Sequence, residues 1–432
     1  MRRWLLAACA APTLVAAQGA PPSEARPIAL AEAVRLAQQN APASVLARGV
    51  IRNTAAATRS AIGAFTPTLT ASMGGAQTTG QTFFQGNLVP FTGLPWNGTQ
   101  AINANLNLFT GFSRVNALRG ARADEETAES NELAARYSVA FQVKQQYFAA
   151  LAAREAEAAA RAQLDAADQQ FRAAAARVQA GAATKSDSLR SVISVGNAKL
   201  ALLSARNNVR NANAALTRLV QSPVPVTPVM ADTTDPSQIA VDSAALQALA
   251  ENGPAVRAAT AQLASAKAGA RAALGTYWPT LSLAYSISGN NPQQSYLPGG
   301  QMAFQNVLRL QLSYTILNGF TREQNVVTTR VAEDNASAQV RDALFLARQN
   351  FAQQLGLLRT AEQQIAIQHA SLAAAEEDLR VQTQRYTLGA STLLDVLTSQ
   401  TSLNQARAAL IQARFDYRNA KAQLEQLVGR EL

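Results

Sequence analysis

The sequence predicts a mixed fold that combines very long coiled-coil helices with β-strands and is built twice in tandem. Three observations support this prediction: an internal repeat, four segments of alternating polar and apolar residues, and helical stretches without proline that are far longer than globular helices. The repeat is roughly 200 residues long, well above solenoid periods, so it is a duplicated domain-sized unit.

The repeat is defined by residues that recur at a constant offset. Over most of each copy the offset is 208 residues, and toward the N-terminus it becomes 212, which fits a longer loop in one copy. We expect a first repeat at 18–220, a connector at 221–241 that holds the only proline-rich stretch, and a second repeat at 242–432. Pairs at the offset of 208 include Gly111/Gly319, Arg177/Arg385, Gly181/Gly389, Thr184/Thr392 and Asp187/Asp395.

The first residues have the pattern of an export signal. Arg2 and Arg3 precede an apolar run, and small residues end at Ala17, so we expect a signal peptide at 1–17 with cleavage after Ala17. The alternative is lipidation of Cys9, the only cysteine, which follows a Leu-Ala-Ala sequence typical of lipoprotein cleavage. Cleavage after Ala17 is preferred because the residues before Cys9 are too few for a full apolar region.

Helices are expected at 30–61 and 242–273, at the start of each copy. After the strands of each copy, two longer helices form a hairpin that turns at a glycine. The return helices carry large residues at every seventh position, with a second series of small residues beside them, which is typical of close coiled-coil packing. Alanine covers much of the remaining surface, so a closed sheet of helices fits better than an isolated hairpin. The hairpin helices are expected at 113–180, 185–220, 321–388 and 392–428.

Four segments alternate with a period of two residues, as strands with one apolar face do. Their lengths approach the roughly ten residues that a tilted strand needs to cross a bilayer, and a soluble sandwich with one buried face is the alternative. Four strands cannot close a barrel, and open sheet edges are not viable in lipid. A membrane location therefore requires several copies of the chain. The segments are 68–73, 102–108, 281–288 and 308–316, with loops at 80–98 and 289–300.

The composition argues against an enzyme. His369 is the only histidine, and it lies in a predicted helix without cysteine or carboxylate residues at ligand spacing. We therefore predict no catalytic residue, no cofactor and no metal. Residues 181–186 resemble the end of a phosphate loop but lack the preceding strand and the glycine before Lys185. The net charge of +10 comes from arginines scattered along helices, which favours solvated helix faces over nucleic acid binding.

Several motifs resemble those of the TolC family of outer-membrane efflux proteins, also called outer membrane factors. The run from Arg385 to Leu397, followed by Asn404, resembles the C-terminal signature of that family, and the match extends over about 30–432. Pro-Thr-Leu at the strands, and Phe-Thr-Gly-Phe (109–112) and Leu-Asn-Gly-Phe (317–320) at the strand-to-helix junctions, resemble it too.

The resemblance implies a homotrimer. Each chain would contribute four strands to one 12-stranded transmembrane β-barrel and long helical hairpins to a 12-helix periplasmic tunnel, which removes the problem of the open sheet edges. The implied location is the outer membrane, with the helical part in the periplasm.

The resemblance also implies a lock at the periplasmic tips of the helices. Asp187 would lie near Tyr386 of a neighbouring hairpin. The basic member of the family's lock aligns with Ser391, which departs from the pattern, although Lys185 could substitute for it.

The constriction is expected beside this lock. The family's two aspartate rings align with Asp395, which is retained, and with Thr398, which departs. Three copies of Asp395 would form one ring of carboxylates that acts as a cation site. The alternative for Asp187 and Asp395 is helix N-capping after the glycine break.

We expect a passive exit duct of a tripartite efflux or type I secretion system. A periplasmic adaptor would dock on the tips, and an inner-membrane pump would drive the substrate. The alternatives are a structural coiled-coil envelope protein without a transport role and, less well supported, an envelope hydrolase, for which the sequence has no catalytic constellation. The expected docking residues are Gly181, Thr184, Lys185, Gly389 and Thr392.

Overall fold

The computed structural model describes residues 25–77, 80–90, 97–229, 243–291 and 303–432. The predicted signal peptide, Cys9 and most of the connector lie outside these residues. The chain forms two compact units, and each unit takes segments from both copies of the repeat. Among the described residues, the first unit comprises 25–37, 146–229 and 375–411, and the second comprises 38–77, 80–90, 97–145, 243–291, 303–374 and 412–432.

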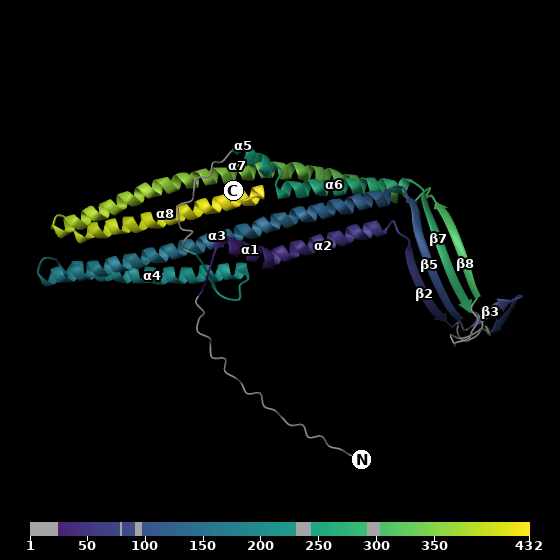
Figure 1. Cartoon of the computed structure of the whole chain (residues 1–432), viewed down its shortest axis with the longest axis horizontal. Helices are drawn as coiled ribbons and strands as arrows, with labels where there is room; N and C mark the ends of the chain where they lie inside the picture. Colours follow the sequence, from purple (N-terminus) through teal and green to yellow (C-terminus); the bar gives the residue numbers. More distant parts are fainter. Residues whose placement is uncertain (1–24, 78–79, 91–96, 230–242, 292–302) are drawn as a thin grey trace, which may run out of the picture. The chain divides into compact units, whose positions relative to one another are not determined.

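Long helical hairpins dominate the chain, as predicted. Helix α3 (Ser113–Gln179) is followed by α4 (Lys185–Val220), and α7 (Thr321–Thr387) is followed by α8 (Leu393–Val428). These bounds agree with the predicted ones to within one residue. In the first unit, α4 runs along the end of α3 (Figure 1).

The predicted heptad positions form the seam between α3 and α4. Val195 and Ala198 of α4 pack with Ala167, Leu164 and Phe171 of α3. One heptad further on, Leu202 and Ala205 pack with Ala160 and Leu164. Large and small residues of α4 thus alternate against the partner helix, which is the packing that the sequence predicts.

A small parallel sheet also belongs to the first unit. Strand β1 (Arg26–Ile28) pairs with β6 (Val226–Pro228), which lies at the start of the connector. The hydroxyl of Tyr147 donates to the carbonyl of Ile28 at 3.2 Å and accepts from the amide of Val229 at 3.2 Å. Tyr147 is fully buried and so fixes both strands to α3.

The opening helix of each copy is two helices, so the single helices predicted at 30–61 and 242–273 are wrong. The first copy has α1 (Leu30–Asn40) and α2 (Pro42–Gly63), and the second has α5 (Ser243–Glu251) and α6 (Pro254–Leu274). A proline begins α2 and α6, where its missing N–H costs nothing, but inside one long helix the same proline would remove a hydrogen bond.

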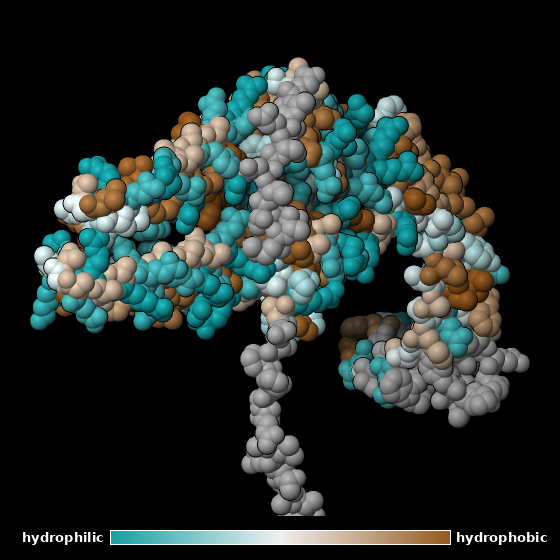
Figure 2. Space-filling view, turned by 60° about the vertical axis from the view of Figure 1, so that its left-hand side comes forward, coloured by the Kyte–Doolittle hydropathy of each residue, from teal (hydrophilic) through white to brown (hydrophobic). Residues whose placement is uncertain are grey.

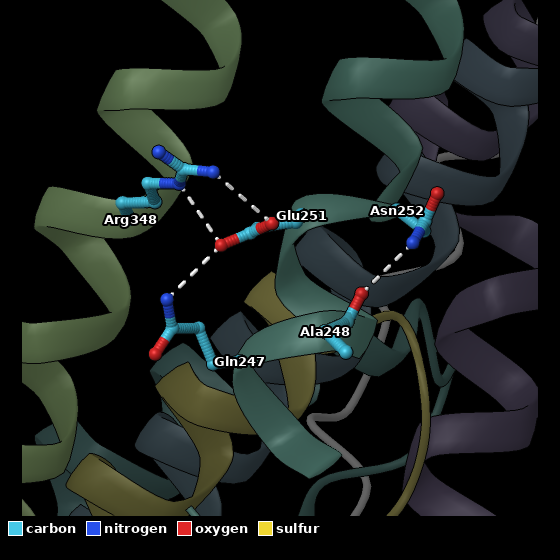
Figure 3. Close-up of polar contacts among 5 residues, drawn as sticks. All are labelled: Gln247, Ala248, Glu251, Asn252 and Arg348. Atoms are coloured by element: carbon cyan, nitrogen blue, oxygen red, sulfur yellow. Dashed lines mark hydrogen bonds and ion pairs between the residues drawn. The ribbon is translucent and has the colours of Figure 1, made fainter. Parts of the chain in front are cut away.

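Helices α5, α7 and α8 enclose a hydrophobic core in the second unit. The core is lined by Phe351 and Leu358 of α7 and by Tyr417 and Leu424 of α8, with Leu246 of α5 closing it. An ion pair reinforces the contact between α5 and α7 (Figure 3).

In this ion pair Arg348 of α7 reaches Glu251, the last residue of α5. Its Nε donates to Glu251 at 2.9 Å, and Gln247 Nε2 donates to the same carboxylate at 3.0 Å. The hydrogen bond from Arg348 is the main cause that lowers the pKa of Glu251 below its ordinary value. The following residue, Asn252, donates from its side chain to the carbonyl of Ala248 at 3.0 Å and so finishes the last turn of α5 (Figure 3).

A buried ion pair connects α3 to α8 in the same unit. The ammonium group of Lys144 lies 2.5 Å from the carboxylate of Glu425, and their side chains are 14% and 7% exposed. The other oxygen of Glu425 accepts from the backbone amide of Leu432 at 3.2 Å. One carboxylate therefore holds both α3 and the last residue of the chain.

The four long strands form one antiparallel sheet. Strands β2 (Thr68–Ala76), β5 (Asn97–Thr110), β7 (Thr280–Asn291) and β8 (Ala303–Ser313) are adjacent in that order. The contact between β5 and β7 joins the hairpins of the two copies and places Ile102 opposite Ile287.

Three details of the strand prediction are wrong. The loop predicted at 289–300 begins too early, because β7 continues to Asn291, and the rest of that loop lies outside the described residues. Residues 314–316 were included in the fourth strand, but β8 ends at Ser313. The predicted loop at 80–98 contains a β-hairpin of β3 (Gln81–Phe84) and β4 (Asn87–Pro90), and β5 begins before that loop ends. Gln85 and Gly86 both have positive φ, which suits the two-residue turn of a tight hairpin.

The apolar face of the sheet is uncovered in the described chain. Leu69 of β2 is 74% exposed, and Leu310 of β8 is 64% exposed. Hydrophobic residues gather along these strands in Figure 2. The sandwich alternative requires a second layer on this face, and the described residues provide none. Strands β2 and β8 are the edges of the sheet.

None of the helices in the described ranges is long and apolar enough to cross a membrane.

Candidate functional site

The two helical tips are built in the same way. At the end of α3, the amide of Gly181 donates to the carbonyl of Val178 at 3.1 Å, and the amide of Ala182 donates to that of Arg177 at 2.8 Å. At the end of α7, the corresponding bonds from Gly389 and Ala390 measure 3.1 and 2.8 Å. Both pairs of bonds are Schellman motifs, which satisfy carbonyl groups that the helix end leaves free.

Glycine is required at both tips by backbone conformation. Gly181 has φ +70° and Gly389 has φ +79°, in the left-handed region. A Cβ atom at either position would meet nothing within 4 Å, so space is not the reason for glycine. The surroundings of both glycines are open, which suits a surface that another protein reaches.

Each return helix begins with a capping box. Asp187 accepts from the amide of Thr184 at 3.1 Å, and its own amide donates to the hydroxyl of Thr184 at 3.3 Å. Asp395 and Thr392 make the same two bonds at 2.8 and 3.3 Å. Both aspartates thus cap helices, as the alternative interpretation of these residues expects.

The cap changes the acidity of Asp395. The backbone hydrogen bond from Thr392 is the largest cause that lowers the pKa of this carboxyl group, and the hydroxyl of Thr392 and the charge of Arg385 act in the same direction. Ionised Asp395 therefore stabilises the folded chain. This stabilisation is fully present above the pKa that Asp395 has in the unfolded chain, and it is lost as the pH falls through the lower pKa that Asp395 has in the folded chain. Asp395 is therefore a carboxylate at neutral pH.

The predicted lock residues are only partly brought together. Among the described residues, the buried hydroxyl of Tyr386 has no hydrogen-bond partner, so it makes no hydrogen bond with Asp187. The lock was predicted between neighbouring hairpins. The ring of Tyr386 instead lies against Arg177, whose guanidinium is 4.6 Å from the ring centre.

Ser391 and Thr398 make local contacts. The hydroxyl of Ser391 donates to the carbonyl of Gln382 in its own hairpin at 3.3 Å. The hydroxyl of Thr398 donates to the carbonyl of Leu394 at 2.9 Å, and Thr398 is exposed. Lys185 is exposed as well, at the first turn of α4. The capped glycine turns and these exposed residues define the tip surface.

Sequence reasoning missed Arg177 as a site residue. Its recurrence as Arg385 was visible, but the repeat does not show which distant residue it contacts. Among the described residues, no group of three histidine, cysteine or acidic side chains is placed to hold a metal ion.

The sequence matches the family described as Outer membrane efflux protein over residues 33–220 and 245–430. The chain belongs to this family. Among curated relatives of this efflux family, it is 27% identical over 357 residues to the outer membrane efflux protein BepC of Brucella suis biovar 1 (strain 1330), which covers 82% of this chain and 77% of BepC.

Solved structures of outer membrane channels have the same fold. The Campylobacter jejuni CmeC outer membrane channel has a TM-score of 0.79 and 18% identity, covering 93% of this chain and 85% of CmeC. The open state of the Neisseria gonorrhoeae MtrE outer membrane channel has a TM-score of 0.78 and 20% identity, covering 93% of this chain and 89% of MtrE.

These matches confirm the resemblance to the TolC family and the predicted mixed fold of coiled-coil helices and barrel strands in a duplicated chain. The protein is an outer-membrane efflux channel, with its helical part in the periplasm. Its family consists of channels rather than enzymes. The alternative of a structural coiled-coil protein without a transport role is not favoured.

Proposed function

We propose that three copies of this chain form a passive exit duct that carries substrates from an inner-membrane pump to the cell exterior. The observation that carries the proposal is the single-layered sheet. Among the described residues, its edge strands β2 and β8 have no partner on one side, and nothing covers its apolar face. If β8 of one chain paired with β2 of the next chain, the backbone groups of both edge strands would be hydrogen-bonded. The apolar face would then be free to contact lipid.

A closed ring of three sheets would contain four strands from each chain. The helical hairpins that follow the strands would continue the duct into the periplasm. The two repeats would form equivalent parts of the tunnel wall. They are the first repeat at 18–220 and the second at 242–432, joined by the connector at 221–241. Removal of the segment 1–17 would accompany export.

The proposed entrance lies at the helical tips. Asp187 and Tyr386 of neighbouring hairpins would close it, and a ring of Asp395 carboxylates beside Thr398 would set the selectivity of the narrowest part. A periplasmic adaptor would dock around Gly181 and Gly389. The open space around both glycines supports this assignment, and Thr184, Lys185 and Thr392 would complete the docking surface.

Purification of the mature protein in detergent tests the assembly. We expect a trimer by light scattering and discrete conductance steps in planar bilayers. A monodisperse monomer would contradict the proposal, because one four-stranded sheet cannot seal itself in lipid. A stable trimer without any channel activity would instead favour a structural role. The same duct would serve either a tripartite efflux system or a type I secretion system.

A further inference from the structure

We propose that a cavity at the end of α4 receives helix α7 of a second copy of this chain. Phe345 of the second copy would enter the cavity, and its Asp342 would pair with Arg218 at the cavity wall. The inference rests on the proposed assembly of three chains and identifies side chains by which neighbouring chains recognise each other. The cavity lies at the end of α4 that is away from the helical tips.

The cavity has a volume of about 840 Å³ and belongs to the first unit. Thr217, Arg218 and Gln221 line it at the end of α4, and Pro223 lines it beyond the helix. Most of the lining surface is apolar, although Arg210 also borders the cavity. An aromatic ring suits such a place, because it buries apolar surface and attracts guanidinium groups to its face.

The end of α8 is the equivalent place in the second copy of the repeat, and α3 of the same chain covers it there. A Cβ atom at Gly429 would lie 3.9 Å from Cε2 of Tyr137. One turn earlier on α8, Glu425 forms the ion pair with Lys144 of α3. All four residues belong to the second unit, so this contact exists within one chain.

The offset of 208 residues transfers this contact to other residues without a gap. Helices α3 and α7 both have 67 residues, and α4 and α8 both have 36. Gly429 corresponds to Gln221, and Tyr137 corresponds to Phe345, which is also aromatic. The backbone agrees, because Gly429 has φ +68° and Gln221 has φ +55°, both in the left-handed region.

The partner for the cavity must come from another chain. In a closed ring of duplicated chains, α4 of one chain meets α7 of its neighbour as α8 meets α3 within the chain. Phe345 is 62% exposed in the single chain, so its ring is available for such a contact. It would fill the cavity beside Gln221, as Tyr137 lies beside Gly429.

Charge complementarity supports the same pairing. In the second unit, Ala134 of α3 and Gln426 of α8 line one cavity. Their equivalents at the offset of 208 are Asp342 and Arg218, an acid and a base. Both are exposed, and neither has an ion-pair partner among the described residues. Asp342 lies three residues before Phe345, so one face of α7 carries both side chains.

Charge reversal in the assembled full chain tests the pairing. Arg218→Asp and Asp342→Arg each bring like charges together, so either trimer should dissociate several-fold faster in detergent than the wild type. The double variant restores opposite charges and should regain most of the stability. Asp334→Arg, about 12 Å earlier on α7, is the matched control and should behave as the wild type. Wild-type dissociation of both single variants would overturn the proposal, and so would a double variant no more stable than the single ones.

The aromatic ring is tested separately. Phe345→Ala should also speed dissociation several-fold, because it leaves the cavity empty. Phe345→Tyr introduces the residue of the equivalent position in α3 and should keep the trimer stable. Equal dissociation rates for the alanine variant and the wild type would remove Phe345 from the contact.

Cross-linking separates this inference from the proposed function. Arg218→Cys combined with Asp342→Cys, treated with a short bis-maleimide, should give bands of two and three chains on a denaturing gel, because the two thiols belong to neighbouring chains. Each single variant should give none. A conducting trimer without these bands would overturn the pairing and leave the proposed function standing. Bands in a trimer that conducts nothing would support the pairing and refute the proposed function.

Discussion

Replacing Leu310 with arginine should hinder assembly in the outer membrane. Leu310 is on the apolar face of β8, where its side chain is 64% exposed in the single chain, and it pairs with Leu283 of β7. Arginine on the lipid face of a barrel costs about 2 to 4 kcal/mol at the bilayer midplane and less toward the interfaces. Leu310 lies near but not at the middle of β8 (Ala303–Ser313), so we expect about 2 kcal/mol per chain.

This cost lowers the equilibrium for insertion by a factor of about 30 for each chain, because about 1.4 kcal/mol corresponds to a factor of ten. The control is Gln311→Arg, one residue further on and on the opposite face, where Gln311 pairs with Ser282. Leu283→Arg and Ser282→Arg repeat the comparison on the neighbouring strand. The amount of trimer in purified outer membranes measures the effect. Equal amounts for all four variants would show that the faces are assigned wrongly.

Three further predictions concern the entrance and the core. Asp395→Asn should weaken the block of the channel by divalent or trivalent cations from the periplasmic side. In the wild type, this block should disappear in acid as the pH falls through the lowered pKa of Asp395. An unchanged block in planar bilayers would leave Asp395 as a helix cap only. Asp187→Ala combined with Tyr386→Phe should loosen the closed state and raise single-channel conductance, and unaltered conductance would argue against the predicted lock. Lys144→Ala should lower the free energy of unfolding by about 3 to 5 kcal/mol, because it leaves the buried Glu425 without its positively charged partner. A midpoint of chemical denaturation equal to that of the wild type would contradict this.

Local patterns predicted most of the fold correctly. The bounds of α4 agree residue for residue with the predicted helix at 185–220, because a glycine cap and a Thr-Asp capping box mark its start. The breaks before Pro42 and Pro254 were missed, although each proline is a recognisable helix start, because the alanine-rich sequence around them continues the helical pattern. The β3–β4 hairpin was missed because glycine and asparagine in that region indicated an irregular loop.

The sequence by itself determined the repeat, the periodicities, the caps and the family, because each depends on residues near one another in the chain or at a fixed offset. Only the tertiary structure decided which distant segments meet. The pairing of β5 with β7 joins the two copies into one sheet, and the contact of Arg177 with Tyr386 joins their tips. The sequence patterns of both copies are nearly the same, so periodicity alone cannot distinguish one such neighbour from another. The packing of the two copies against each other makes that choice, because it depends on all the side chains of a boundary together.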